Sequence, residues 1–424
     1  MEILDKFKGI CTIPHCSFDA LQLRDYLVDF AKKSGFSVRI DEFDNIYAIK
    51  GKPKICLQSH YDMVCVGDAP NIELIDDGKI LRAKNSSLGA DNGIGVVIMM
   101  DMMEKFENLE VLFSANEEVG LIGANGFNGR IISGRLLNLD SEHEDGVFIG
   151  CAAGELIHAR IKASKVPTNN RLYELSVLNL PGGHSGLEII KDIPNSIKIL
   201  AEFIAKNNGK IVDINGGERS NSIPVNAKGI VICDEIIHSD DRVVVRELGV
   251  GGEVLEFGDN ILALINSFSQ GVRSYDENLK IVRDSINLSR IKSNDSVIEL
   301  EFFARSMSED GLEKLKFETA SLAKLAGFEV SFFERSGAWT PKIGEFANVV
   351  LKFMQENNPK VKFQAVHAGL ECGVFVAKQN GLEAASIGPN IYSPHSINEH
   401  LEIDSLEKIA KVVEKIVAYY QKIM

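Results

Sequence analysis

The sequence predicts an α/β protein in which one domain, a mostly parallel mixed sheet flanked by helices, is interrupted by an inserted α+β domain. Short apolar runs alternate with helical patterns in the first part of the chain, and alternating strands replace them from about residue 156. The α/β character returns after residue 336. At roughly 150 residues per domain, the 424 residues suffice for two or three domains. The expected boundaries are 1–155, 156–336 and 337–424.

The first part of the chain carries the signals of a buried sheet. Residues 18–33 place Leu23 and Leu27 at helical spacing, and Gly35 follows as a stop. Apolar runs predict strands and the segments between them predict helices; the strands are expected at 54–58, 109–114 and 135–139, and the helices at 93–104 and 120–127. Short apolar runs between helices are typical of a largely buried, mostly parallel sheet.

The inserted part has a different pattern. Alternating residues predict strands at 174–180, 242–248 and 297–303, and two amphipathic helices accompany them, one around Leu200 and one around Leu315. In the final part, Asp404 followed by Glu407 predicts the start of a helix whose apolar face runs to Tyr420.

The charge balance excludes some classes of partner. The chain has 46 Lys and Arg against 60 Asp and Glu, a net charge of −14, whereas a nucleic-acid binder needs a basic surface. No basic cluster indicates a membrane surface, and the longest apolar run, from Ile94, is broken by Asp101. The N-terminus lacks the apolar core of a signal peptide. We therefore expect a cytoplasmic protein with no nucleic-acid and no membrane partner.

The cysteines favour a reducing compartment. There are seven, an odd number, and none forms a C-x-x-C pair. Cys65 and Cys372 flank residues of two motifs, QSHYDMV and HAGLECG, and each is expected to be a small buried side chain and not a nucleophile.

Polar side chains that could bind metal follow three of the predicted strands. His60 and Asp62 follow the first run, Glu117 and Glu118 follow the second, and Asp140 follows the third. Open α/β sheets bind ligands beyond the carboxyl ends of their strands, so these groups are expected to converge. Two further candidates lie in loops, Asp91 in LGADNG and His395 in GPNIYSPHS.

Imidazoles mixed with several carboxylates suit zinc, manganese or cobalt. The ligands outnumber the needs of one catalytic ion and fit two ions that share a bridge, for which Asp91 is the natural candidate. One of the two adjacent glutamates would then be free to act as a general base. Each piece also has a simpler interpretation, because paired glutamates often form a solvated face and Asp91 could merely cap its helix.

Seven segments together resemble one family. QSHYDMV, LGADNG, NEEVG, NLDSE, GGHSG, HAGLECG and SPHS are similar to the aminoacyl-histidine dipeptidase branch of the dinuclear zinc metallopeptidases, a family that also includes carboxypeptidases, aminoacylases and peptidase T-like enzymes. The resemblance implies a cytosolic enzyme that hydrolyses unblocked dipeptides, with Xaa-His among its substrates. It implies two divalent metal ions, with zinc expected first and manganese or cobalt as alternatives. Residues 1–155 and 337–424 would form the catalytic domain, and 156–336 a lid and dimerisation domain.

The resemblance also implies a role for each site residue. One ion would be held by His60, Asp91 and Asp140, and the other by Asp91, Glu118 and His395, with Asp91 as the bridge. Asp62 would orient the His60 ring, and Glu117 would move a proton from the bridging water to the leaving amine. A cis peptide bond is expected between Asp91 and Asn92.

The inserted domain would complete the site. His184 in GGHSG is implied to stabilise the oxyanion of the tetrahedral intermediate, although a bare GGH is usually an ordinary turn. Asn221 and Arg305 match positions that contact substrate, and a guanidinium suits a substrate carboxylate; Arg305 could equally be a surface strand residue. A homodimer through the lid is favoured, in which His184 could serve the neighbouring subunit, and a monomer whose lid covers its own site is the alternative.

Two other functions are alternatives to a dipeptidase. A related amidohydrolase would act on tripeptides or N-acyl amino acids, and a substrate panel separates it from a dipeptidase. A catalytically inactive metal-binding scaffold is the other alternative. The retained Glu117 argues against the scaffold, because holding metal needs Glu118 but not its neighbour.

Overall fold

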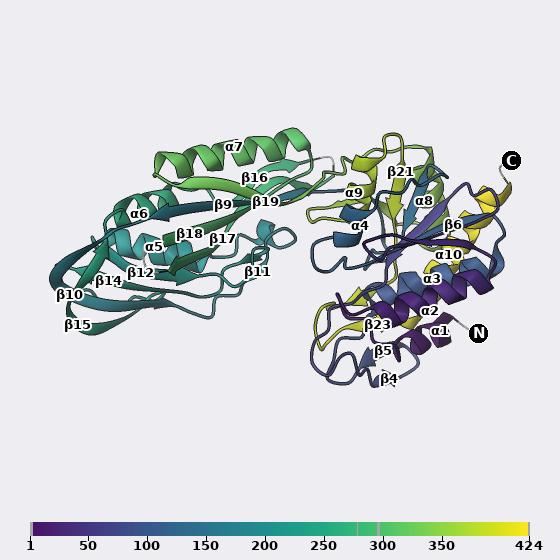
Figure 1. Ribbon diagram of the computed structural model, residues 1–424, viewed down its shortest axis with the longest axis horizontal. Helices are drawn as coiled ribbons and strands as arrows, with labels where there is room; N and C mark the ends of the chain where they lie inside the picture. Colours follow the sequence, from purple (N-terminus) through teal and green to yellow (C-terminus); the bar gives the residue numbers. More distant parts are fainter. Residues whose placement is uncertain (1–2, 278, 295–296, 423–424) are drawn as a thin grey trace. The chain divides into compact units, whose positions relative to one another are not determined.

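The computed structural model describes residues 3–277, 279–294 and 297–422, which form two compact units (Figure 1). The first unit contains the described residues up to Cys151, then Trp339–Ala365, and those from Leu370 onward. The second contains Ala152–Ala338 and Val366–Gly369. The short return of 366–369 to the second unit was not expected from the sequence. The assignment of the second unit as a lid and dimerisation domain stays a prediction.

The first unit is built on a mixed sheet with the strand order β1-β2-β6-β3-β7-β21-β8-β20. Its strands are β1 Ser37–Ile40, β2 Ile46–Lys50, β3 Cys56–His60, β6 Leu109–Ser114, β7 Arg135–Asn138, β8 Gly146–Cys151, β20 Lys362–Val366 and β21 Glu383–Ser386. The central strands β6, β3, β7 and β21 pair in parallel, and β1, β2 and β8 pair antiparallel beside them. The predicted α/β fold with a mixed sheet is confirmed, with the parallel pairing concentrated at the centre.

Helices cover this sheet. They are α1 Ile3–Ile10, α2 Leu21–Lys33, α3 Ala90–Lys105, α4 Ile122–Gly126, α8 Glu345–Asn357, α9 Glu371–Lys378 and α10 Ile403–Lys422. Every residue of β3 and β6 is buried, and because successive side chains point to opposite faces, both faces of the sheet are covered there. Helix α3 packs against α1, α2, α10 and β3 (Figure 1). The predicted face of α10 is buried from Leu406 to Tyr420.

A small sheet joins the end of the chain to its early part. Its strands are β4 Leu74–Asp76, β5 Ile80–Ala83, β22 Ile391–Tyr392 and β23 His400–Glu402, in the order β22-β23-β5-β4. The loop between β22 and β23 contains His395, so this pairing fixes both ends of the loop that carries a predicted ligand.

The second unit is an antiparallel sheet with the path β15-β10-β14-β12-β17-β18-β9-β19, and β16 pairs with β17. Its strands are β9 Ala153–Lys162, β10 Lys165–Val177, β12 Lys210–Gly216, β14 Ala227–Cys233, β15 Val244–Leu255, β16 Gly271–Asp276, β17 Ile281–Asn294, β18 Val297–Ser306 and β19 Glu329–Ser336. One hydrophobic core joins this sheet to α5 Ser196–Lys206, α6 Gly258–Ser267 and α7 Glu309–Leu325. A short pair, β11 Gly183–His184 and β13 Ser222–Ile223, lies apart from the main sheet.

Local chemistry explains where the two predicted helices of this unit begin. The Asn195 side chain accepts hydrogen bonds from Ile197 N and Lys198 N at the start of α5, and Ser308 accepts one from Gly311 N at the start of α7. In the part of the chain that the structure describes, none of the helices has both the length and the apolar character of a membrane span.

The structure corrects the expectation for Cys65, which forms a disulfide with Cys16 across a Cα–Cα distance of 5.5 Å. The two segments lie side by side because Met63 N donates to His15 O and Ser17 N donates to Met63 O, at 3.0 and 3.1 Å. Sequence spacing does not reveal such a tertiary contact. The other cysteines are free and buried, and Cys372 is confirmed as a small buried side chain.

The pairing predicts a thiol count. Unfolded in denaturant without reductant, the protein should present five reactive thiols out of its seven cysteines, because Cys16 and Cys65 are paired. Reduction before unfolding should raise the count to seven. A thiol-reactive chromophore measures both values, and the Cys16→Ser variant, which leaves Cys65 unpaired, is the control. Seven thiols without reductant would contradict the disulfide.

Candidate metal centre

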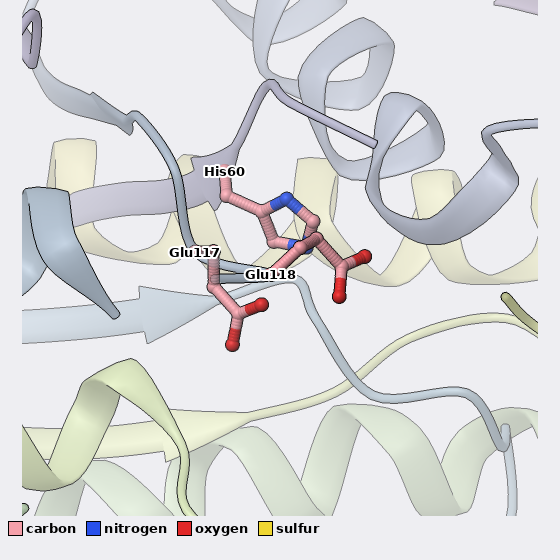
Figure 2. A group of neighbouring side chains, drawn as sticks. All are labelled: His60, Glu117 and Glu118. Carbon is pink, nitrogen blue, oxygen red and sulfur yellow. The ribbon is translucent and has the colours of Figure 1, made fainter. Parts of the chain in front are cut away.

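The order of the central strands brings the predicted strand-end residues together. His60 is the last residue of β3 and lies opposite Ser114, the last residue of β6. Glu117 and Glu118 follow β6, and Asp140 follows β7 on the other side of β3. Figure 2 shows the side chains of His60, at the end of its strand, and of Glu117 and Glu118, in the loop after theirs, close together. The convergence expected from the sequence is therefore present.

The predicted ligands form two groups that share Asp91. His60 Nε2 lies 3.2 Å from Asp91 Oδ1 and 3.2 Å from Asp140 Oδ1. His395 Nε2 lies 3.1 Å from Asp91 Oδ2 and 2.8 Å from Glu118 Oε2. Within each group one ligand atom from each residue lies within 4.8 Å of the others. The two oxygens of Asp91 thus face different histidines, the arrangement that a bridging carboxylate needs.

Glu117 lies close to the same ligands. Its carboxylate, the His60 ring and the Glu118 carboxylate also fall within 4.8 Å of one another. Proximity alone therefore does not separate the glutamate that binds metal from the one that does not. The contacts of His395 make the difference, because His395 Nε2 meets Glu118 and Asp91.

Asp62 orients His60 in a way that differs in one detail from the expectation. His60 Nδ1 lies 3.0 Å from the backbone oxygen of Asp62 and 3.5 Å from its carboxylate, so the backbone oxygen is the closer acceptor. A proton held on Nδ1 leaves Nε2 free to bind metal. The Asp62 carboxylate itself accepts hydrogen bonds from Ser17 Oγ at 2.7 Å and from Glu117 N at 3.0 Å. Asp62 thereby links the His60 strand to the loop that carries Glu117.

The electrostatics of the centre fit a cation. Burial alone would lower the pKa of His60, but the carboxylates of Asp140, Asp62 and Asp91 outweigh it and raise that pKa well above its usual value. Burial also lowers the pKa of His395, but the carboxylates of Asp91 and Glu118 outweigh this effect and raise the pKa to about 11. Without metal, the carboxylates hold protons on the two imidazoles. Divalent ions would replace those protons and neutralise the same carboxylates.

Two acidic groups beside this centre have raised pKa values. Burial, with the charges of Glu118 and Asp140 nearby, raises the pKa of Glu117 well above its usual value. Burial and the nearby Asp91 and Asp140 raise the pKa of Glu142 to about 8. Glu142 was not singled out in the sequence, because a glutamate two residues after Asp140 has no distinguishing pattern.

Glu371, the first residue of α9, was also missed. It is 0% exposed, and its Oε2 accepts hydrogen bonds from Ser114 Oγ at 2.8 Å and from Gln58 Nε2. Ser114 ends β6 and Gln58 lies in β3, so this carboxylate holds together the two strands that deliver Glu117 and His60. The motif HAGLECG contained Glu371, but nothing in its residue type indicated a partner in the sheet.

The same network continues across β7. Asn138 Nδ2 donates to Gln58 Oε1 at 2.7 Å, and Asn138 Oδ1 accepts from Asp140 N at 3.2 Å and from Ser386 Oγ of β21. Gln58, Asn138 and Ser386 are each 0% exposed. Buried polar groups are costly unless they are paired, so this network favours one register for the four central strands.

The second unit contains its own polar cluster around His184. His184 in β11 pairs with Ser222 in β13, and Ser185 N donates to Asn221 O at 2.8 Å. Arg305 in β18 is 5% exposed, so it is not a surface residue, and its Nη2 lies 3.4 Å from His184 Nε2. The structure thus brings the three predicted residues of this unit together.

Hydrogen bonding fixes the tautomer of His184. Its Nδ1 accepts hydrogen bonds from Gly186 N at 3.2 Å and from Leu187 N at 3.0 Å. A neutral ring that accepts at Nδ1 carries its proton on Nε2. A proton on Nε2 makes that nitrogen a hydrogen-bond donor.

His367 joins this cluster and does not belong to the ligand groups found among the described residues. Its Nε2 lies 2.7 Å from Ser285 Oγ. Burial, together with the nearby charge of Arg305, lowers the pKa of His367 to about 3, so the ring is neutral. His367 thus lies with Ser285 and outside the candidate ligand groups of the described residues.

Comparisons with known proteins point to one family. The family model described as peptidase family M20/M25/M40 matches residues 56–419. The cytosol non-specific dipeptidase of Escherichia coli (strain K12) is 30% identical, over 95% of this chain and 94% of that protein. The crystal structure of aminoacylhistidine dipeptidase from Vibrio alginolyticus matches with a TM-score of 0.82 and 27% identity, covering 100% of this chain and 96% of that one. A tripeptidase from Staphylococcus aureus, 16% identical, shares the fold with a TM-score of 0.61, over 99% of this chain and 97% of that one.

Proposed function

Because the chain belongs to peptidase family M20/M25/M40, we propose that it is a metal-dependent dipeptidase that hydrolyses unblocked dipeptides, Xaa-His among them. The single observation that carries the proposal is the pair of ligand groups sharing Asp91, with Glu117 beside them. The relatives named as dipeptidases in Escherichia coli and Vibrio alginolyticus support it.

Two divalent ions fit the centre, one between His60, Asp91 and Asp140 and the other between Asp91, Glu118 and His395. Zinc suits this mixture of imidazoles and carboxylates, and manganese or cobalt are the alternatives. When bound, such ions lower the pKa of water and polarise the substrate carbonyl. The protein supplies their ligands, and the contacts of Asp62 and Glu371 hold those ligands in place.

Glu117 is the proposed general base and acid. It takes a proton from the attacking water and later gives it to the leaving amine. Its position is fixed at the backbone by the hydrogen bond from Glu117 N to Asp62. Its raised pKa suits a group that must hold a proton during part of the reaction.

The second unit is proposed to bind the substrate. His184 donates from Nε2 to the developing oxyanion, the buried Arg305 binds the free carboxylate of the dipeptide, and Asn221 contacts the substrate backbone. A buried guanidinium without a carboxylate partner among its described contacts is suited to an anionic ligand. That His184 and Glu117 act on the same substrate stays a prediction.

The assembly and location are further parts of the proposal. We expect a homodimer through the second unit, and the alternative is a monomer. The cytosol is the expected location, supported by the name of the Escherichia coli relative. Peptides are the expected ligands, with no nucleic-acid or membrane partner.

The reaction and the base are tested together. Protein loaded with zinc should hydrolyse free dipeptides faster than tripeptides or N-acetyl amino acids. Glu117→Gln should lower kcat on those dipeptides by about 10²–10⁴-fold, because proton transfer is lost. Its zinc content should stay at the wild-type level, because Glu118 holds the metal. Steady-state kinetics and metal analysis measure the two effects.

The exposed Glu107 pairs with Lys50 just before β6, at the opposite end of that strand from Glu117, and Glu107→Gln provides the matched control. It should match the wild type in both readouts. A Glu117→Gln variant with wild-type kcat would contradict the proposed base. Wild-type protein that binds zinc and hydrolyses nothing on the panel would favour the scaffold, and a preference for tripeptides or N-acetyl amino acids would favour the related amidohydrolase.

The carboxylate site is tested by Arg305→Lys. Lysine keeps the positive charge but cannot donate two parallel hydrogen bonds to a carboxylate as the guanidinium does, so KM for free dipeptides should rise about tenfold. The KM for the corresponding dipeptide amides should change little, since they lack the carboxylate. Arg290→Lys, at an arginine paired with Glu301, is the control. An equal rise for acids and amides would show that Arg305 does not bind the carboxylate.

A further inference from the structure

Glu399 makes an unusual set of contacts with the loop that carries Asp91. Its Oε2 accepts hydrogen bonds from Leu88 N at 2.7 Å and Gly89 N at 3.0 Å. Its Oε1 accepts from Ala90 N at 2.8 Å and Asp91 N at 3.2 Å. Glu399 is 2% exposed. One buried carboxylate therefore satisfies four consecutive backbone N–H groups.

These N–H groups belong to the start of α3, where the helix itself offers no acceptors. A negative charge is favourable at that end, and hydrogen bonds to a charged acceptor are stronger than neutral ones. The backbone here is irregular, since Gly89 has a φ of 73° and Asp91 and Asn92 have non-helical angles. A Cβ at Gly89 would lie 2.8 Å from Met63 Sδ, so the path is also crowded. Glu399 thus holds the backbone from which the Asp91 side chain projects.

Glu399 also belongs to the segment that carries His395. Ser396 Oγ donates to Ser393 O at 2.8 Å, and Glu399 N donates to Ser396 O at 3.2 Å, which makes the segment a compact turn. From this turn, His395 contacts the Asp91 carboxylate and Glu399 contacts the Asp91 backbone. One short segment therefore holds the shared ligand at two places.

We propose that Glu399 is a positioning residue of the metal centre, which fixes Asp91 for its bridging role without itself binding an ion. The inference rests on the proposed function of the centre. Among the described residues, the candidate ligand groups do not include Glu399. Each of its two carboxylate oxygens already accepts two hydrogen bonds from backbone N–H groups. The carboxylate therefore binds the loop and not an ion.

The test is the zinc affinity of Glu399→Gln. An amide keeps one acceptor oxygen, but its NH₂ group would face two backbone N–H donors. Two of the four hydrogen bonds to the loop would therefore be lost. The dissociation constant for zinc, measured on metal-free protein by competition with a coloured chelator, should rise about 10–100-fold. Activity lost at limiting zinc should return when zinc is added. An unchanged zinc affinity would overturn the proposal.

Glu402→Gln is the matched control, because Glu402 lies three residues further on and accepts a hydrogen bond from Asn390 Nδ2 at 2.7 Å instead of from the Asp91 loop. It should bind zinc as the wild type does. A role in stability alone would lower the unfolding midpoint of metal-free Glu399→Gln and leave the zinc affinity of the folded protein unchanged, which would also overturn the proposal.

Glu399→Asp provides a second variant if Glu399→Gln does not fold. It keeps the charge but is one methylene shorter, so it should bind zinc more weakly than the wild type and more tightly than any folded Glu399→Gln. Wild-type affinity in Glu399→Asp would contradict the proposal. Because zinc binding is measured without substrate, failure of wild-type protein to hydrolyse dipeptides would refute the proposed function and leave this measurement to decide the role of Glu399.

Discussion

The candidate centre depends on the Asp91 carboxylate, whose two oxygens face two different histidines. Oδ1 lies 3.2 Å from His60 Nε2 and Oδ2 lies 3.1 Å from His395 Nε2. His60 comes from the central sheet and His395 from a loop near the end of the chain, so this one side chain joins regions separated by more than 300 residues. Glu118 and Asp140 complete the two groups. A shift of Asp91 would therefore alter both groups at once.

The surrounding structure supports this contact from two directions. Within the sheet, a buried hydrogen-bond network from Glu371 through Gln58 to Asn138 favours one register for β6, β3 and β7. At the start of α3, Glu399 holds the loop that carries Asp91. In both places a buried carboxyl group accepts hydrogen bonds from neighbouring segments, and together these contacts pre-organise ligands that would otherwise repel one another.

The sequence predicted the features that follow from local pattern. Apolar runs located β3, β6 and β7, and the polar residues at their ends identified His60, Glu117, Glu118 and Asp140. The resemblance added the cis peptide bond at Asp91–Asn92, which the structure contains. The pattern could not reveal Glu371, Glu399 or the Cys16–Cys65 pair, because each acts through partners distant in sequence. The return of 366–369 to the second unit depends on tertiary contacts in the same way.

Anomalous diffraction from crystals grown with zinc tests the central claim most directly. The account predicts two zinc peaks about 3.5–4 Å apart. Asp91 should bind both, with His60 and Asp140 on one ion and Glu118 and His395 on the other. A single peak, or two peaks of which only one contacts Asp91, would contradict the claim that this carboxylate is the shared ligand of a two-metal centre.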